Sequence, residues 1–216
     1  MKFEAVLFDL DGTLLDTIED LTDSMNEALK GLGFPGHDSE ACKMFVGDGV
    51  ETFALRALPK NRRDEATVAK CVADMRREYS KRWAQKTRPY DGIPELLDRL
   101  TSHHIKMSIL SNKPDDSTRE MVAELLSKWP FDPVVGARPT VPKKPDPTMA
   151  IQIAQQLQVE PKNFLYLGDT GTDMKTARDS GMFALGALWG FRTAEELMAN
   201  GAKALVEHPR EVLQLL

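Results

Sequence analysis

The sequence contains few cysteines and histidines, so it offers little for a metal site built from sulfur or imidazole ligands. Only Cys42 and Cys71 are present among 216 residues, and their separation matches no zinc-binding pattern. We expect both to be buried thiols. The four histidines are scattered through polar segments, and we assign them no catalytic or metal-binding role. These shortages exclude a disulfide framework and a cysteine-rich or histidine-rich metal centre.

The sequence also lacks long apolar runs and an excess of positive charge. No stretch approaches the roughly 18 apolar residues that span a bilayer, and Met1 and Lys2 lead directly into a short strand pattern rather than a signal peptide. The net charge of −5 disfavours nucleic acid and anionic membranes as partners. We therefore expect a cytoplasmic protein that holds any anionic ligand in a local site. The sequence leaves its oligomeric state open between a monomer and a homodimer.

A short apolar run near the N-terminus, residues 5–8, ends in two acidic residues. Asp9 and Asp11 are two positions apart and precede a Gly-Thr turn, so a strand would direct both carboxylates to the same face. Two such charges about 4 Å apart repel by roughly 4 kcal/mol at an effective dielectric near 20. A hard cation with oxygen ligands, such as Mg²⁺, would offset this repulsion. A solvated turn is the alternative interpretation of the same residues.

The rest of the chain divides into a helical and an alternating segment. Residues 16–83 show helical spacing, whereas the chain from Tyr90 onward repeats strand, loop and helix. The alternation predicts an α/β fold, a Rossmann-like doubly wound parallel sheet core with an inserted α-helical cap. We predict a core domain of residues 1–15 and 88–216 and a cap domain of residues 16–87. The expected later strands are 105–110, 131–135, 164–167, 183–188 and 204–206, followed by a last helix over 207–216.

Polar residues gather at the predicted carboxyl ends of these strands, where doubly wound sheets bind their ligands. The residues in question are Asp9, Asp11, Ser111, Lys143, Lys144, Asp169 and Asp173. Carboxylates suit a hard cation, whereas a hydroxyl and an ammonium suit phosphate oxygens. A carboxylate can also act as the nucleophile in phosphoryl transfer. The pattern therefore predicts a site for a cation and a phosphate group.

Four ordered segments resemble the motifs of the haloacid dehalogenase superfamily of phosphohydrolases. They are DLDGTLLDT at 9–17, SNK at 111–113, KPDP at 144–147 and GDTGTD at 168–173. Within the superfamily the chain looks most like the phosphoglycolate phosphatase branch, whose helical cap follows the first motif. The resemblance implies a Mg²⁺-dependent phosphatase of small phosphorylated metabolites, with 2-phosphoglycolate as the lead substrate and an aspartyl phosphate intermediate.

The resemblance also implies roles for individual residues. Asp9 would attack phosphorus, and Asp11 would protonate the leaving oxygen and then activate water. Ser111 would hydrogen-bond the phosphoryl group and Lys144 would neutralise it, whereas Lys113 and Lys143 are expected to be solvated loop charges. The implied metal ligands are Asp9, the backbone of Asp11, Asp169 and Asp173, the last through water or by orienting Lys144. The candidate substrate-binding residues are Gly12, Thr13 and Asn112 in the core and Lys43, Gly47, Gly49 and Arg56 in the cap.

Other functions fit the same residues. A sugar phosphomutase of the β-phosphoglucomutase type would return the phosphoryl group to its product and would require a bisphosphate for turnover. A pyrophosphatase or nucleotide phosphatase would use the same core. A phospho-accepting signalling domain also places acids, a hydroxyl and a lysine at strand ends, but such domains are much shorter and lack a helical insertion. A binding-only relative is disfavoured because every catalytic position is occupied.

Overall fold

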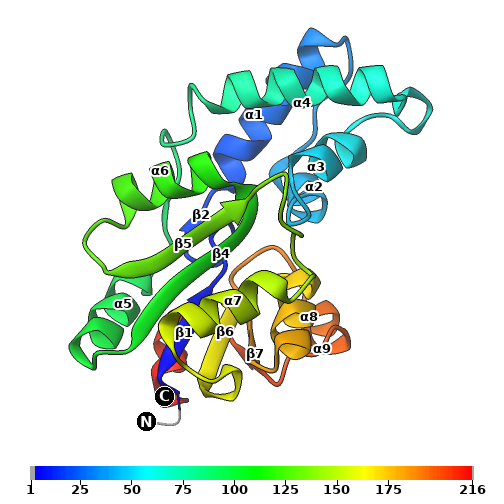
Figure 1. Cartoon of the computed structure of the whole chain (residues 1–216). Coiled ribbons are helices and arrows are strands. Elements are labelled where there is room, and N and C mark those ends of the chain that lie inside the picture. Colours follow the sequence, from blue (N-terminus) through cyan, green and yellow to red (C-terminus); the bar gives the residue numbers. More distant parts are fainter. Residues whose placement is uncertain (1–2, 216) are drawn as a thin grey trace. The chain divides into compact units, whose positions relative to one another are not determined.

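The protein, analysed as a computed structural model that describes residues 3–215, consists of two compact units (Figure 1). One unit comprises Met1–Leu15 and Pro89–Leu216, and the other comprises Asp16–Arg88. The chain passes from one unit to the other through β2 (Leu15–Asp16) and β3 (Arg88–Pro89), which form a two-stranded sheet. Met1 and Lys2 at the start, and Leu216 at the end of the last expected helix, lie outside the described residues.

The α/β unit is organised around a six-stranded sheet in the order β5-β4-β1-β6-β7-β8, with every neighbouring pair parallel (Figure 1). Strand order reverses at β1, which pairs with β4 on one side and β6 on the other. This topology confirms the predicted doubly wound fold and places its switch point beside β1. The strands are β1 (Ala5–Phe8), β4 (Lys106–Pro114), β5 (Phe131–Ala137), β6 (Phe164–Gly168), β7 (Phe183–Ala187) and β8 (Ala204–Val206).

The sheet is buried on both faces, since β1 is apolar at every position and every residue of β1 and β6 is buried. In β1, Ala5 and Leu7 join a core cluster with residues of α7 and α8, while Val6 and Phe8 point to the opposite face and are also fully buried. The helices of this unit are α5 (Ile93–Ser102), α6 (Asp115–Leu125), α7 (Thr148–Leu157), α8 (Gly171–Ser180) and α9 (Ala194–Ala199). Two 3-10 helices, η2 (Pro161–Asn163) and η3 (Pro209–Gln214), complete it.

The second unit is helical, as the spacing of its apolar residues predicts. It contains α1 (Ile18–Gly31), α2 (Ser39–Phe45), α3 (Val50–Ala57), η1 (Lys60–Arg62) and α4 (Glu65–Tyr79). Helix α1 packs against α4, with Met25 in contact with Cys71. The apolar stripe of α1 is buried and consists of Ile18, Leu21, Met25, Ala28 and Leu29. Both cysteines are buried free thiols, as expected. None of the described helices combines the length and the hydropathy that a bilayer crossing requires.

Two expected elements differ from the structure, both in segments where local pattern is weak. The strand expected at 105–110 continues as β4 through Pro114, because β5 pairs with it as far as Pro114 and extends the ladder. The last expected helix, over 207–216, is the short 3-10 helix η3. His208 caps η3 by accepting a hydrogen bond from the Arg210 N–H, and Pro209 occupies its first turn.

Candidate active site

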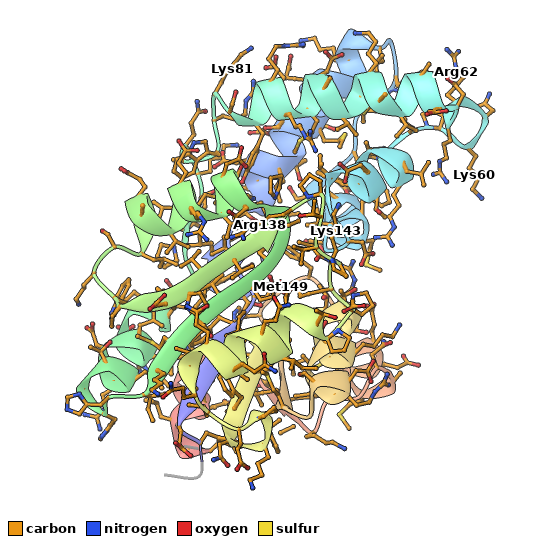
Figure 2. The ribbon with its side chains drawn as sticks, viewed as in Figure 1. Lys60, Arg62, Lys81, Arg138, Lys143 and Met149 are labelled. Atoms are coloured by element: carbon orange, nitrogen blue, oxygen red, sulfur yellow. The ribbon has the colours of Figure 1, made fainter. Side chains whose placement is uncertain are left out.

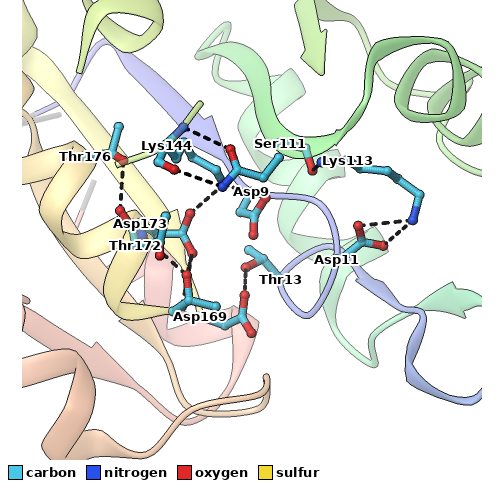
Figure 3. A network of polar contacts seen from close by, with 12 residues as sticks. Asp9, Asp11, Thr13, Ser111, Lys113, Lys144, Asp169, Thr172, Asp173 and Thr176 are labelled. Atoms are coloured by element: carbon cyan, nitrogen blue, oxygen red, sulfur yellow. Dashed lines mark hydrogen bonds and ion pairs between the residues drawn. The ribbon is translucent and has the colours of Figure 1, made fainter. Parts of the chain in front are cut away.

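The carboxyl ends of three neighbouring strands bring the predicted site residues of the α/β unit together (Figure 3). Asp9 directly follows β1, Ser111 lies near the end of β4, and Asp169 directly follows β6. Because β1 pairs in parallel with both β4 and β6, these three ends share one edge of the sheet. Lys144 reaches the same edge from the loop between β5 and α7.

Lys144 lies between two of the carboxylates. Its Nζ is 2.8 Å from Oδ1 of Asp9 and 2.6 Å from Oδ1 of Asp173, and all three side chains are buried (Figure 3). Burial lowers the pKa of Lys144, but the carboxylates of Asp173 and Asp9 more than offset it, so that its pKa lies well above its ordinary range. Lys144 is therefore a fixed positive charge beside Asp9.

Asp9, Asp169 and Asp173 form a buried cluster whose nearest oxygen atoms lie within 4.8 Å of one another. Burial, reinforced by Asp173, raises the pKa of Asp9 to about 7, and burial together with Asp9 and Asp173 raises the pKa of Asp169 well above its ordinary value. Three buried carboxylates beside one lysine leave an excess of negative charge, and the only metal-ligating atoms that they offer are oxygens. This donor set fits a hard divalent cation such as Mg²⁺.

The carboxylate of Asp169 is held by donors from two distant loops. Thr13 donates its hydroxyl to Oδ1 at 3.0 Å, and the backbone N–H of Phe191 donates to Oδ2 at 2.8 Å. A Cβ on Gly12 would lie 2.3 Å from Oδ2 of Asp169, and one on Gly190 would lie 2.3 Å from Cβ of Asp169. Both loops therefore approach this carboxylate closely because they carry glycine there. The hydroxyl of Thr13, a predicted substrate-binding residue, is used to support Asp169.

Asp173 is held by the helix that carries it. Thr170 is the N-cap of α8, and its N–H and hydroxyl donate to Oδ2 of Asp173 at 3.1 and 2.6 Å. The other oxygen, Oδ1, accepts from Lys144 and, at 3.3 Å, from the hydroxyl of Tyr166. The Thr170-x-x-Asp173 spacing is thus a capping box, a local signal that the sequence analysis did not use. With both oxygens occupied in this way, Asp173 is better suited to orient Lys144 than to ligate a metal directly.

Asn112 fixes the backbone at Lys144. Its side-chain amide donates to the carbonyl of Lys144 at 3.0 Å, and its side-chain oxygen accepts from the N–H of Lys144 at 2.9 Å. The two hydrogen bonds fix the loop that carries the lysine. Asn112 was predicted to bind substrate through its backbone amide, which stays a prediction; its side chain joins β4 to this loop, a contact that sequence spacing could not reveal.

Asp11 and Lys113 correct two of our expectations. The strand ends at Phe8, before both acids, and the carboxylate of Asp11 points away from Asp9 toward Lys113 (Figure 3). Nζ of Lys113 lies 2.9 and 3.1 Å from the two oxygens of Asp11. The expected crowding of the two acids is therefore relieved by two lysines, one for each carboxylate. The prediction that Lys113 is a solvated loop charge was wrong, because its side chain is only 6% exposed.

Ser111 and Lys143 are the remaining residues that the sequence analysis placed at strand ends of the core. Ser111 is buried, and its hydroxyl oxygen accepts from the N–H of Lys113 at 3.2 Å. Lys143, next to the buried Lys144, is exposed on the loop that precedes α7, whose first turn carries Met149 (Figure 2). The two neighbouring lysines therefore have different environments, and only Lys144 joins the carboxylate cluster.

Three of the predicted cap residues, Gly47, Gly49 and Arg56, lie at one turn of the helical unit. Gly47 and Gly49 flank Asp48 between α2 and α3, and Arg56 donates to Oδ2 of Asp48 at 2.6 Å and to the Phe45 carbonyl at 3.1 Å. Lys43, on α2, donates to Glu40 at 2.7 Å. Arg56 therefore braces the turn that carries the two glycines.

Comparisons with known proteins agree with the architecture and with the motifs. The family model described as "Haloacid dehalogenase-like hydrolase" matches residues 6–187. A phosphoglycolate phosphatase of Aquifex aeolicus is 31% identical over 186 residues, which cover 86% of this chain and 85% of the relative. An N-acetylmuramic acid 6-phosphate phosphatase of Pseudomonas aeruginosa is 30% identical over 218 residues, covering 100% and 96% of the two chains.

Solved structures extend the similarity to the whole chain. A provisionally named phosphoglycolate phosphatase from Lactobacillus delbrueckii subsp. bulgaricus superposes with a TM-score of 0.92 at 28% identity, covering 100% of this chain and 98% of the other. A haloacid dehalogenase-like family hydrolase from Streptococcus pneumoniae has a TM-score of 0.87 at 25% identity, with 99% and 98% coverage.

Proposed function

Because the chain belongs to the haloacid dehalogenase-like hydrolase family, we propose that it is a Mg²⁺-dependent phosphatase of small phosphate monoesters, with 2-phosphoglycolate as the lead substrate. The observation that carries this proposal is the position of Lys144, which contacts both Asp9 and Asp173 inside a buried carboxylate cluster. A carboxylate next to a fixed cation is suited to attack phosphorus, because the cation neutralises the incoming phosphoryl charge.

In the first half of the proposed reaction, an oxygen of Asp9 forms a bond to phosphorus while the bond from phosphorus to the leaving oxygen breaks. Asp11 gives its proton to that oxygen, which departs as an alcohol. Ser111, the neighbouring backbone amides and Lys144 bind the phosphoryl oxygens during the transfer. The product of this half is an aspartyl phosphate on Asp9.

In the second half, water attacks the phosphorus of the aspartyl phosphate. Asp11 takes the proton of the water, the bond between phosphorus and Asp9 breaks, and phosphate leaves with Asp9 restored as a carboxylate. Asp9, Asp169 and the backbone carbonyl of Asp11 would hold Mg²⁺, with Asp173 supporting through Lys144 or water. When bound, the ion supplies positive charge to the phosphoryl oxygens.

The proposal is tested by phosphate release from a panel of esters, with Mg²⁺ and with a chelator. The panel contains 2-phosphoglycolate, N-acetylmuramic acid 6-phosphate, hexose phosphates, nucleotide monophosphates and pyrophosphate. We expect Mg²⁺-dependent release that is strongest on 2-phosphoglycolate. Asp9→Asn abolishes release, whereas Asp116→Asn, an exposed carboxylate of α6, leaves it unchanged. Full activity of a folded Asp9→Asn protein would refute the nucleophile assignment.

The relative named for N-acetylmuramic acid 6-phosphate supports a second candidate, a phosphatase of sugar phosphates, because it is 30% identical over 100% of this chain. Preference for this ester or for a hexose phosphate over 2-phosphoglycolate would favour that candidate. A strict requirement for a bisphosphate cofactor would instead indicate a mutase. The two phosphatase candidates differ in the ester that the enzyme selects, whereas a mutase would differ in returning the phosphoryl group to its product.

We also propose that residues 16–87 act as a cap that selects the substrate, through Lys43, Gly47, Gly49 and Arg56. The bracing of the Gly47–Gly49 turn by Arg56 supports this, because a rigid turn presents its backbone amides in a defined direction. Lys43→Ala and Arg56→Ala are expected to change the ratio of activities on 2-phosphoglycolate and on p-nitrophenyl phosphate. Lys60→Ala, an exposed lysine of η1 in the same unit (Figure 2), is the matched control. An unchanged ratio in both variants would contradict the assignment.

A further inference from the structure

Trp189 links the segment after β7 to the loop after β1. Its indole N–H donates to the carbonyl of Thr13 at 3.0 Å, across 176 positions of the sequence. In the same segment, the backbone N–H of Phe191 donates to one oxygen of Asp169, and Thr13 donates its hydroxyl to the other (Figure 3). Three hydrogen bonds therefore join the ends of the neighbouring strands β1, β6 and β7 in a closed ring.

Gly190 brings this segment close to both of the other loops. A Cβ at this position would lie 2.4 Å from the carbonyl oxygen of Gly12 and 2.3 Å from Cβ of Asp169, so only glycine fits. The ring of Phe191 packs against Gly12, since a Cβ on Gly12 would lie 2.8 Å from Cε2 of that ring. The segment and the two loops are therefore in direct contact and are not joined by the three hydrogen bonds alone.

Both ends of the segment are anchored, so the direction of the indole is set by the fold. At one end, the N–H of Leu188 donates to the carbonyl of Val206 in β8 at 2.9 Å. At the other, Thr193 is the N-cap of α9, and its hydroxyl accepts from the N–H of Glu196 at 3.3 Å. Trp189 lies between these two anchors.

The carbonyl that Trp189 holds belongs to a compact loop. The N–H groups of residues 13–15 all donate to the carbonyl of Leu10, at 3.3, 3.0 and 3.0 Å. These bonds close the loop on itself, so a contact that fixes Thr13 also fixes the direction of its hydroxyl toward Asp169. Partners that orient a metal-ligating side chain change metal affinity by about 10- to 100-fold.

We propose that Trp189 is a positioning residue for the Mg²⁺ site, because it holds Thr13 with its hydroxyl directed at Asp169. This inference rests on the proposed function, since it assigns Trp189 to the metal site of that reaction. In this role Trp189 contacts neither metal nor substrate and acts through Thr13. Its loss weakens Mg²⁺ binding and leaves the groups that transfer the phosphoryl group in place.

The test is Trp189→Phe, which keeps an aromatic ring and removes the N–H. Mg²⁺ affinity is measured by calorimetry and by the Mg²⁺ dependence of phosphatase activity. We expect affinity to fall about 10-fold, the lower end of the range, because Trp189 acts through a second residue. At saturating Mg²⁺, kcat stays within about threefold of the unmodified protein, which a general loss of structure would not allow. Trp129→Phe, which removes an indole N–H that donates to Asp98 at 2.7 Å, is the matched control and leaves Mg²⁺ affinity unchanged.

The double variant Trp189→Phe with Thr13→Val shows whether Trp189 acts through Thr13. If it does, the double variant binds Mg²⁺ no more weakly than Thr13→Val alone. An additional loss in the double variant, or a fall in kcat at saturating Mg²⁺ as large as the loss of affinity, would overturn the inference.

Two further outcomes are decided by the same calorimetry. If Trp189→Phe does not fold, the titration uses protein with benzothienylalanine at position 189, which keeps the shape of the indole without its N–H, and unchanged affinity there overturns the inference. If the unmodified protein binds no Mg²⁺, the proposed function fails and the inference falls with it. An unmodified protein that binds Mg²⁺ no better than its folded Trp189→Phe variant contradicts the inference alone.

Discussion

Replacing Thr13 with valine tests whether the hydrogen bonds around Asp169 serve a metal site. The hydroxyl of Thr13 is fully buried and donates to Oδ1 of Asp169 at 3.0 Å, while Phe191 serves the other oxygen. Valine keeps the shape of threonine and removes only the donor. Thr13→Val therefore leaves a buried carboxylate with one of these two donors, and Thr13→Ser, which keeps the hydroxyl, is the matched control.

The size of the effect follows from what the donor does for the ionised carboxylate. Loss of a partner that orients a metal-ligating side chain lowers metal affinity by about 10- to 100-fold, or about 1.4 to 2.8 kcal/mol. A hydrogen bond to a charged group contributes about 1.5 to 3 kcal/mol, which agrees with this range. The hydrogen bond from Thr13 also lowers the pKa of Asp169, which burial holds well above its ordinary value. Its loss strengthens proton competition, so the defect in Mg²⁺ affinity is larger at pH 6 than at pH 8.

The measurement is a Mg²⁺ titration followed by calorimetry and by phosphatase activity, at both pH values. We expect Thr13→Val to need about 10- to 100-fold more Mg²⁺ for half-saturation and Thr13→Ser to remain within a few-fold of the unmodified protein. Equal Mg²⁺ affinity of Thr13→Val and the unmodified protein would refute the reasoning. So would an equal loss in Thr13→Ser, because that variant retains the donor.

Two further predictions concern stability. Burial raises the pKa of Asp9 from its ordinary value of 3.8 to about 7 in the folded protein. The folded protein therefore binds more protons than the unfolded chain between these values, and the metal-free protein becomes less stable as pH rises through them. Mg²⁺ should therefore raise Tm more at pH 8 than at pH 5, and a metal-free Tm that climbs over this range would contradict the sign. In the helical unit, one oxygen of the buried Asp20 accepts hydrogen bonds from the Lys86 N–H and from the N–H and hydroxyl of Thr87. Asp20→Ala leaves these donors without their acceptor. The free energy of unfolding measured in urea titrations should therefore fall by about 2 to 4 kcal/mol. Asp23→Ala, with a side chain 43% exposed, is its control and should have a far smaller effect.

Much of the fold could be predicted from local pattern. The run from Ala5 to Phe8 has room only for a strand, and the apolar stripe of α1 from Ile18 to Leu29 repeats with a helical period. Strands alternating with helices lead to a parallel sheet because the crossovers must cover its faces. The prediction of a last helix over 207–216 was wrong. The helical segment there, 209–214, is short and begins with proline, so packing rather than helix propensity decides its form.

The gathering of Asp9, Ser111, Lys144 and Asp169 could also be predicted, because the carboxyl ends of parallel strands share one edge. The side-chain contacts that these residues make at that edge could not be predicted. The environments of Lys113 and Lys143 were not distinguished, and the expectation that both are solvated failed for Lys113, whose side chain turns inward to Asp11. The capping box of Thr170 and Asp173 was the one local signal that could have been found.

The sequence by itself determined the order of strands and helices, the chemical types of the site residues and the strand ends on which they lie, since each depends on neighbours within a few positions. Only the tertiary structure decided which donor meets which acceptor. Asn112 holds the backbone of Lys144 across 32 positions, Lys113 holds Asp11 across 102, and Thr13 holds Asp169 across 156. Contacts of this reach depend on sheet register and on the close approach of glycine loops, which appear only when the whole chain has folded.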